Sequence, residues 1–236
     1  ENYNCRLILT KGGYFKKLSV QAARVEEHKL KEGDAIIYEA EVHNKDELMF
    51  FTNQAQVYFA RVSDFDLTKA SEIGEYVGKR LKFDMDERPM IMLVNPQLTE
   101  KQNMIFIFEN GKGVRVPATC YETKSVRRKL VGAYSSASPI VAVFHEVEKN
   151  PFEIMLVSDV DRAIVIKTSL IPEKATRSSG GVTLMTLKKG QKLVDCCANF
   201  EEKYENAKGY RKLKIPASGS LLSDKDISSR QLKIDG

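Results

Sequence analysis

The amino-acid sequence predicts an all-β, propeller-like fold, a ring of about five four-stranded blades. Two observations predict it. Short runs rich in Ile, Val, Phe and Tyr are bounded by Gly, Asn, Asp or Lys, which is typical of β-hairpins. These runs recur with a period of about 42 to 57 residues, measured between Thr10, Thr52, Glu109, Ser158 and Glu205. A repeat of this length, with three or four short strands per unit, is typical of propeller blades.

The repeated unit is a short apolar run, a polar turn, and a run that mixes apolar and basic residues. We predict hairpins that start near residues 5, 46, 104, 152 and 201. The fifth copy keeps the turn and the basic strand but lacks the apolar run. The phrase FENGKGVR from Phe108 returns as YENAKGYR from Tyr204, about 96 residues later. We interpret the second phrase as the same hairpin turn, two blades further along.

A further strand is predicted before each later hairpin, in AIIYEAEV from Ala35, PMIMLV from Pro89, PIVAVFHEV from Pro139 and KLVDCCANF from Lys192. One blade cannot bury both of its faces, so its neighbours must complete the core. SEIGEYVGKRL from Ser71 is the best candidate for a turn or two of helix, but its two glycines favour a connecting loop. Residues 219–236 are interpreted as a tail or a ring-closing segment of a single domain that spans residues 1–236.

Composition bounds the class of protein. Of 236 residues, 42% are hydrophobic and 29% charged, and no apolar run approaches the length of a membrane span, so no membrane partner is expected. The chain starts at Glu1, and we expect it to be a piece of a longer protein. Cys5 and Cys120 are isolated, and the adjacent Cys196 and Cys197 form no CxxC motif. This pattern favours reduced thiols in a cytoplasmic protein over disulfides or a zinc site.

Glycine and histidine motifs indicate turns and packing more than chemistry. The chain has neither GxxxxGK[ST] nor GxGxxG, so we interpret the glycines near Gly12, Gly111 and Gly180 as residues of positive φ at hairpin turns. His43 and His145 stand at equivalent places near the ends of strands, which favours a repeated structural role over a metal site. We expect no catalytic residue, metal or cofactor in this chain.

Charge is unevenly distributed. The net charge is +5, yet residues 21–50 carry four basic against eight acidic side chains. Residues 121–132, by contrast, carry four basic side chains against one acidic. Residues 172–192 and 203–214 each hold five basic side chains against one acidic. Such clustering favours a basic surface stripe and a polyanionic partner, with ordinary solvated loops as the alternative.

Several long stretches together carry a family resemblance: LKEGDAIIYEAEVHNKDELMFFTNQAQVYFARVSDFDLTKASEIGEYV from Leu30, FENGKGVRVPATCYETKSVRRKLVGAYSSASPIVAVF, TRSSGGVTLMTLKKG and GYRKLKIPASGSLLSDKD. The ordered set resembles the C-terminal region of a bacterial type IIA topoisomerase A subunit, as in DNA gyrase A and topoisomerase IV A of the clostridial type. The resemblance implies a β-pinwheel, in which propeller-like blades exchange strands with their neighbours. It also implies binding of double-stranded DNA around a basic outer rim.

The resemblance implies partners as well. In this family the domain is joined to an N-terminal cleavage–religation core of the same subunit, works with an ATPase B-type subunit, and acts in the cytoplasm on the nucleoid. Members that wrap DNA as gyrase carry a loop of the form QRRGGKG. The nearest string here, TRSSGGV from Thr176, lacks those cations. This departure favours a topoisomerase IV-like bending of DNA over wrapping.

The predicted function is sequence-nonspecific binding and bending of duplex DNA by phosphate contacts, with wrapping left open, to position a segment for ATP-dependent strand passage by the rest of the enzyme. The alternative from a different class is a propeller that serves as a protein-interaction platform with a basic rim. A degenerate propeller enzyme would need convergent acid–base groups that the sequence does not offer. The predicted DNA-binding residues are Lys16, Lys17, Lys124, Arg127, Arg128, Lys129, Lys174, Arg177, Lys188, Lys189, Arg211 and Lys212.

Overall fold

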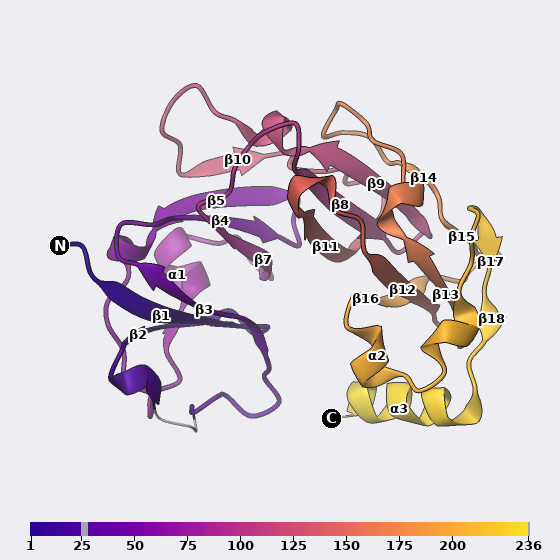
Figure 1. Ribbon diagram of the computed structural model, residues 1–236, viewed down its shortest axis with the longest axis horizontal. Helices are drawn as coiled ribbons and strands as arrows, with labels where there is room; N and C mark the ends of the chain where they lie inside the picture. The colour runs from indigo at the N-terminus through magenta and orange to yellow at the C-terminus, as the bar shows by residue number, and fades with distance from the viewer. Residues whose placement is uncertain (25–27, 236) are drawn as a thin grey trace. The chain divides into compact units, whose positions relative to one another are not determined.

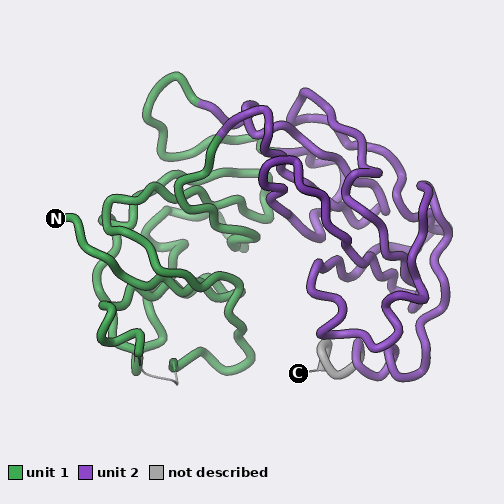
Figure 2. Tube along the Cα trace, in the orientation of Figure 1, with its two compact units in different colours: residues 1–97, 123–133 green, residues 98–122, 134–236 purple. Residues whose placement is uncertain are grey.

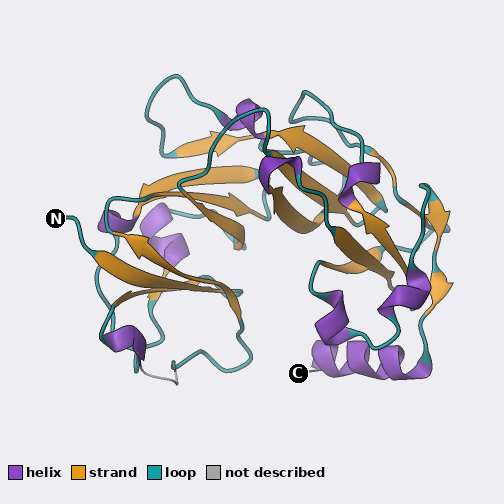
Figure 3. Cartoon of the chain, viewed as in Figure 1, coloured by secondary structure: helices purple, strands orange, loops and turns teal. Residues whose placement is uncertain are grey.

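The computed structural model describes residues 1–24 and 28–235, and strands joined by short helical turns make up most of it (Figures 1 and 3). Within these residues the strands form four four-stranded antiparallel sheets and one two-stranded parallel sheet. The chain divides into two compact units, residues 1–97 with 123–133 and residues 98–122 with 134–236 (Figure 2). Each unit holds two of the four-stranded sheets.

The first unit has a hairpin at the centre of each sheet. In the first sheet, of order β3-β1-β2-β6, the strands are β1 (Asn4–Thr10), β2 (Tyr14–Ser19), β3 (Ile36–His43) and β6 (Glu75–Tyr76). In the second sheet, of order β10-β5-β4-β7, they are β4 (Glu47–Thr52), β5 (Gln56–Arg61), β7 (Pro89–Val94) and β10 (Lys129–Val131).

The second unit repeats this plan. Its sheet of order β11-β8-β9-β14 contains β8 (Asn103–Phe108), β9 (Lys112–Pro117), β11 (Ile140–Glu146) and β14 (Val182–Thr183). Its sheet of order β16-β12-β13-β18 contains β12 (Glu153–Ser158), β13 (Arg162–Lys167), β16 (Leu193–Cys197) and β18 (Ser220–Leu221). The small parallel sheet pairs β15 (Met185–Thr186) with β17 (Ala217–Ser218).

Helices are short and lie mainly in the connections. The α-helices are α1 (Val77–Leu81), α2 (Phe200–Lys203) and α3 (Asp224–Asp235). The 3-10 turns are η1 (Ala22–Arg24), η2 (Val62–Asp64), η3 (Ala118–Tyr121), η4 (Val147–Lys149), η5 (Thr168–Leu170) and η6 (Ala207–Tyr210). The predicted helix candidate from Ser71 therefore divides into strand β6 and helix α1, and its first glycine, Gly74, stands directly before the strand.

The blades exchange strands, as the resemblance implies. The fourth strand of each four-stranded sheet comes from chain beyond the following repeat: after the next hairpin in the first three sheets, and after the helical turns α2 and η6 in the last. Strand β14, for example, follows the β12–β13 hairpin in sequence but pairs with β9 of the preceding sheet. Strands β6, β10 and β18 pair in the same way with β2, β5 and β13. The all-β, pinwheel-type class is therefore confirmed, and so are the hairpins that start near residues 5, 46, 104 and 152.

Alternation along the strands builds the core of each unit. In β12, Ile154 and Leu156 pack in one cluster with Ile105 and Ile107 of β8. The intervening Met155 and Val157 join a different cluster on the opposite face of the sheet. In the first unit, one cluster joins Leu7 of β1 to Phe50 of β4. Since side chains on a strand alternate between faces, a sheet with two apolar faces needs a covering layer on both sides.

The fifth blade is where the prediction was wrong. No hairpin starts near residue 201 in the described chain; helices α2 and η6 stand there, followed by α3 (Figure 3). Phe200 of α2, Tyr204 just after it and Ala207 of η6 are all buried in one cluster with Met155 and Val165 of the fourth sheet. Helical turns thus cover the face that a fifth blade was expected to cover, and the described blades number four.

The repeated phrase has two different structures. FENGKGVR contains the β8–β9 turn, as predicted, but YENAKGYR follows α2 and contains η6. There the buried carboxylate of Asp226 in α3 accepts hydrogen bonds from the Tyr210 hydroxyl at 2.5 Å and the Glu205 amide at 2.8 Å. Residues 219–236 are accordingly more than a tail: β18 completes the fourth sheet, and α3 supplies the carboxylate that holds this turn.

Candidate nucleic-acid interface

The exchanged strands are reached by four segments that we call the crossing segments: residues 66–74, 123–128, 172–181 and 211–219. Before each of them a 3-10 turn ends beside a buried apolar or aromatic residue, which is Phe65, Tyr121, Ile171 or Tyr210. Each segment then runs to the second strand of the preceding hairpin. Backbone bonds accompany the crossing, as where the Lys174 amide donates to the Arg115 carbonyl at 2.9 Å.

Glycine allows the closest approach on two of these paths. Gly74 and Gly181 stand directly before β6 and β14 and have φ of +104° and +74°. A Cβ on Gly74 would lie 2.6 Å from the Phe15 carbonyl oxygen, and one on Gly181 would lie 2.0 Å from that of Gly113. The prediction for the GG pair at Gly180 was right about positive φ but wrong about place, because Gly181 serves a crossing and not a hairpin turn.

Basic residues concentrate on three of the four crossing segments. Segment 66–74 carries two carboxylates against one lysine, whereas 123–128 and 211–219 each carry three cations and no carboxylate. Segment 172–181 carries two cations and one carboxylate. Part of each cluster seen in the sequence therefore lies at one topological position in three repeats, although Lys188, Lys189 and Lys192 of the cluster in residues 172–192 lie beyond the crossing segment.

Five predicted residues are exposed and have no side-chain ion pair or hydrogen bond among the described residues. They are Lys124, Arg127, Lys174, Lys188 and Lys189. The first three lie on crossing segments, and the lysine pair lies in the turn between β15 and β16. Lys214, on the last crossing segment, is exposed in the same way and was missed, although it stands within the basic run that the sequence displays. Unpaired, hydrated cations of this kind are the groups that contact phosphates.

Arg128 and Lys129 are engaged with the body of the first unit. Both cations lie over the Tyr58 ring, at 5.7 and 5.5 Å from its centroid. The Arg128 guanidinium donates to the Leu81 carbonyl at 2.5 Å, and Lys129 forms an ion pair with Asp84 at 3.3 Å. Burial, together with the hydrogen bond to Glu87, raises the pKa of Tyr58, so this ring stays neutral beneath the cations. These two residues fasten the crossing segment that presents Lys124 and Arg127.

Three predicted residues of the second unit are partly engaged. Arg211 is held by Glu153 of β12 and Lys212 donates to the Ser220 hydroxyl at 3.0 Å. Arg177 is half-buried, and its Nη1 is buried with no hydrogen-bond acceptor among the described residues. A buried donor without an acceptor is costly, and this nitrogen is not open to a phosphate.

Lys16 and Lys17 are corrections to the predicted set. Their exposed fractions are 0% and 2%, so neither ammonium is open to a polyanion. Lys16 donates to the Ala70 carbonyl at 3.0 Å, and burial lowers its pKa. Lys17 donates to Asn44 Oδ1 at 2.5 Å and to the carbonyls of Val62 and Phe65. Both lysines therefore satisfy the carbonyls of the turn and segment that cover β2, an environment that the local sequence does not reveal.

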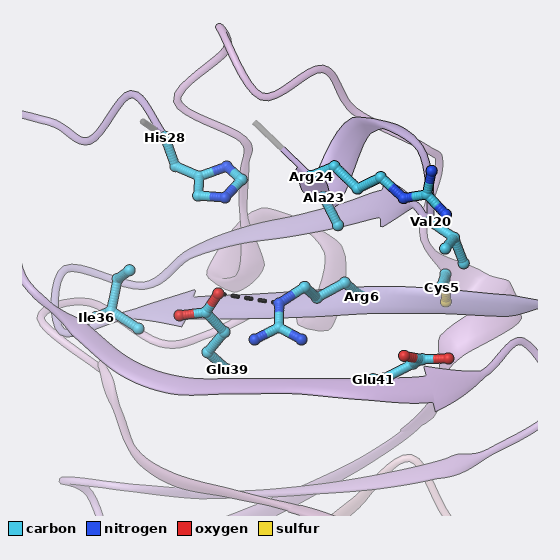
Figure 4. Close-up of a pocket in the computed structure, with 9 residues that line it drawn as sticks. All are labelled: Cys5, Arg6, Val20, Ala23, Arg24, His28, Ile36, Glu39 and Glu41. Atoms are coloured by element: carbon cyan, nitrogen blue, oxygen red, sulfur yellow. Dashed lines mark hydrogen bonds and ion pairs between the residues drawn. The ribbon is translucent and has the colours of Figure 1, made fainter. Parts of the chain in front are cut away.

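A cavity of about 570 Å³ opens in the first unit near β1 and β3 (Figure 4). Figure 4 shows the Arg6 guanidinium turned toward Glu39, to which it donates at 2.9 Å. Burial raises the pKa of the Cys5 thiol, which is protonated at neutral pH and so a poor nucleophile. We assign no chemistry to this cavity, and the crossing segments remain the candidate site.

Comparisons with known proteins agree with this geometry. The family described as "DNA gyrase C-terminal domain, beta-propeller" matches residues 46–74 and 153–196. The first matched stretch ends at Gly74, and the second includes the third crossing segment. A relative, the A subunit of DNA topoisomerase 4 from Staphylococcus aureus (strain MRSA252), is 22% identical over 177 residues. That match covers 74% of this chain and 22% of the relative, so the chain spans about a fifth of the length of such relatives.

Solved structures show the same fold. The crystal structure of the C-terminal domain of DNA topoisomerase IV has a TM-score of 0.71 and 21% identity, over 83% of this chain and 61% of that one. The E. coli ParC C-terminal domain has a TM-score of 0.61 and 10% identity, over 94% of each chain. Among the described residues, no helix combines the length and apolar character needed to cross a membrane. The resemblance to the C-terminal domain of a bacterial type IIA topoisomerase A subunit is confirmed.

Proposed function

We propose that this relative of the type IIA topoisomerase A C-terminal domains binds double-stranded DNA without sequence preference and bends it. One observation carries the proposal: three crossing segments at one topological position present cations, and several of these cations have no side-chain partner among the residues that the structure describes. Phosphate contacts of this kind supply affinity and carry no sequence information. A purely structural role for the segments would not require their cations to remain unpaired.

The number of available cations sets the expected affinity. The exposed, unpaired cations described above are Lys124, Arg127, Lys174, Lys188, Lys189 and Lys214. Six phosphate contacts give a slope of log affinity against log salt of about −5, and a loss of about 10³-fold between 50 and 200 mM salt. Bending 20 to 30 base pairs by 40 to 90° costs on the order of 1 to 6 kcal/mol. At low salt the contacts offset this cost.

The wider setting belongs to the same proposal. The chain would be linked to an N-terminal cleavage–religation core of its own subunit, act with an ATPase subunit in the cytoplasm, and position a DNA segment for strand passage. It would need no cofactor of its own. The absence of a QRRGGKG string favours bending over wrapping. Relaxing plasmid with the chain bound and then reading the linking number separates the two, because wrapping shifts the linking number with a fixed sign.

The test is a gel-shift titration with random-sequence linear duplex at several salt concentrations. Replacing Lys124 and Arg127 together with Ala should weaken binding and flatten the salt slope by about 1.8, because two contacts are lost. Replacing Lys11 and Lys101 with Ala is the matched control, since both are exposed and lie off the crossing segments. If the two pairs of substitutions weaken binding equally, the crossing segment contributes only through the net charge of the chain. No retardation of duplex by the unchanged chain would overturn the proposal and favour a protein-interaction platform.

A further inference from the structure

Three large apolar side chains of the described chain are more than four-fifths exposed: Met85 at 85%, Val126 at 103% and Leu213 at 84%. Single exposed apolar residues are common on protein surfaces and by themselves indicate nothing. The charges of the neighbouring side chains distinguish Met85 from the other two. Met85 stands in a turn between Asp84 and Asp86, whereas Val126 and Leu213 stand on crossing segments among cations.

The two crossing residues have the same local plan. Val126 follows the buried Tyr121 and lies between Lys124 and Arg127. Leu213 follows the buried Tyr210 and lies between Lys212 and Lys214. In each case a buried tyrosine and a backbone pairing to the neighbouring strand hold the segment, so the apolar side chain is presented from a fixed base. A stripe that contacted phosphates alone would have no use for an apolar side chain at its most exposed point.

We propose that Leu213, and on the corresponding segment Val126, enters the minor groove of the bound duplex and wedges apart a base step. The inference rests on the proposed DNA binding and adds the means of bending. Apolar side chains inserted between base steps partly unstack them and kink the duplex. The flanking cations supply the charge complementarity, because they can contact the phosphates that border the groove. Leucine, the longer side chain, is the stronger wedge of the two.

The first crossing segment also carries an exposed leucine, but it lacks the flanking cations. Leu67 occupies that segment and is 52% exposed, but its neighbour is Asp66 and the segment carries a net negative charge. A carboxylate beside the apolar side chain repels phosphate. Leu67 therefore provides a matched control on an equivalent segment of the chain.

The experiment uses a 30-base-pair duplex with 2-aminopurine at a central TA step, since pyrimidine–purine steps kink most easily. Binding of the unchanged chain should raise the 2-aminopurine fluorescence, because the base is unstacked. The Leu213→Ala and Val126→Ala double variant should lose more than half of this rise and bind about 3- to 10-fold more weakly. Its salt slope should stay the same, because no cation has been removed. The Leu67→Ala and Met85→Ala double variant should behave as the unchanged chain.

The outcomes are distinguishable. Duplex binding with no fluorescence rise, or with a rise that the double variant reproduces in full, would overturn the wedge and leave the proposed function standing. Failure of the unchanged chain to bind duplex at any salt would overturn both. The substituted side chains are exposed, so the double variants should keep the urea unfolding midpoint of the unchanged chain, and that measurement excludes a folding defect as the cause of any loss.

Discussion

Arg211 and Glu153 form a two-point ion pair, with the Arg211 Nε donating to Glu153 Oε2 at 2.6 Å and its Nη2 donating to Oε1 at 2.7 Å. Arg211 lies on the most cationic kind of crossing segment, yet a carboxylate of β12 holds its guanidinium. A bidentate pair fixes an arginine far better than a single contact does. The cation is thus held against Glu153 and is only partly available to a phosphate.

Glu153→Gln should release that charge while keeping the size of the side chain. We expect tighter binding to duplex DNA and a salt slope steeper by about 0.9, because one more cation reaches a phosphate. Gel shifts at a series of salt concentrations measure it. Glu100→Gln, at an exposed position off the crossing segments, makes the same change in net charge and should leave the slope unaltered. If Glu100→Gln steepens the salt slope equally, the Arg211–Glu153 ion pair does not limit the contact of Arg211 with DNA.

Lys17→Met should destabilise the first unit and leave the DNA affinity of the folded chain unchanged. The substitution keeps a long apolar stem but removes the donor for Asn44 Oδ1 and for the Phe65 carbonyl, while the Val62 carbonyl still accepts from the Phe65 amide. Each buried acceptor left without a donor costs about 1–3 kcal/mol. Urea unfolding measures the loss, with Lys11→Met on the exposed turn of the same hairpin as the control. A weaker DNA complex with undiminished stability would return Lys17 to the interface.

Gly181→Ala should lower the free energy of unfolding of the second unit by about 3 kcal/mol or more. The left-handed φ alone costs an alanine about 1–2 kcal/mol, and the new Cβ would also meet the Gly113 carbonyl oxygen. Gly190→Ala is the control, because Gly190 has φ of +83° and no atom within 4 Å of the added Cβ. Denaturant unfolding of the two variants compares them directly. Equal losses would mean that the backbone approach at β14 is looser than the structure shows.

His145→Gln should flatten the acid dependence of stability. Burial lowers the pKa of His145 from 6.5 in the folded chain. Below pH 6.5 the unfolded chain therefore takes up a proton that the folded chain does not, and the free energy of unfolding falls as the pH falls, until the folded pKa is reached. The slope is at most about 1.4 kcal/mol per pH unit.

Urea unfolding at pH 7.5 and 5.5 tests this sign. The unchanged chain should lose more stability on acidification than His145→Gln does. His43→Gln is the matched control, because it makes the same change at an exposed imidazole at the end of β3, the corresponding strand. A chain that gained stability on acidification would contradict the burial of His145.

The central hairpins and the third strands could be predicted because their signal is local. In MIFIF and EIMLV, short apolar runs end at turn residues, and these boundaries need no knowledge of distant residues. The exchanged strands could not be predicted in this way. Strands β6, β14 and β18 have two residues each, which is too short for any periodicity to show. Gly74 and Gly181 were the available signal, and they mark close backbone approach as readily as they mark a turn.

The candidate site divides along the same line. Lys124, Arg127 and Lys174 stand in runs with an excess of basic residues, and charged side chains are seldom fully buried. Lys16 and Lys17 also stand together as a basic pair in the sequence. In the structure they lie beneath η2 and the crossing segment that follows it, where backbone carbonyls take the place of water as acceptors for their ammonium groups. The fifth repeat was predicted as a hairpin from its turn and its basic strand, whereas Phe200, Tyr204 and Ala207 lie in and between α2 and η6 and are buried against the fourth sheet.

By itself the sequence determined that this protein is built of repeated hairpins, that its cations gather in a few runs, and which family it resembles. All of these follow from neighbours along the chain. Only the tertiary structure decided which strand completes which blade, that helical turns cover one face of the fourth sheet, and which lysines are exposed to water. These features depend on residues that are distant in the sequence and pack against the segment in the folded chain. Whether a charged group or a carbonyl is buried is set by those packing residues.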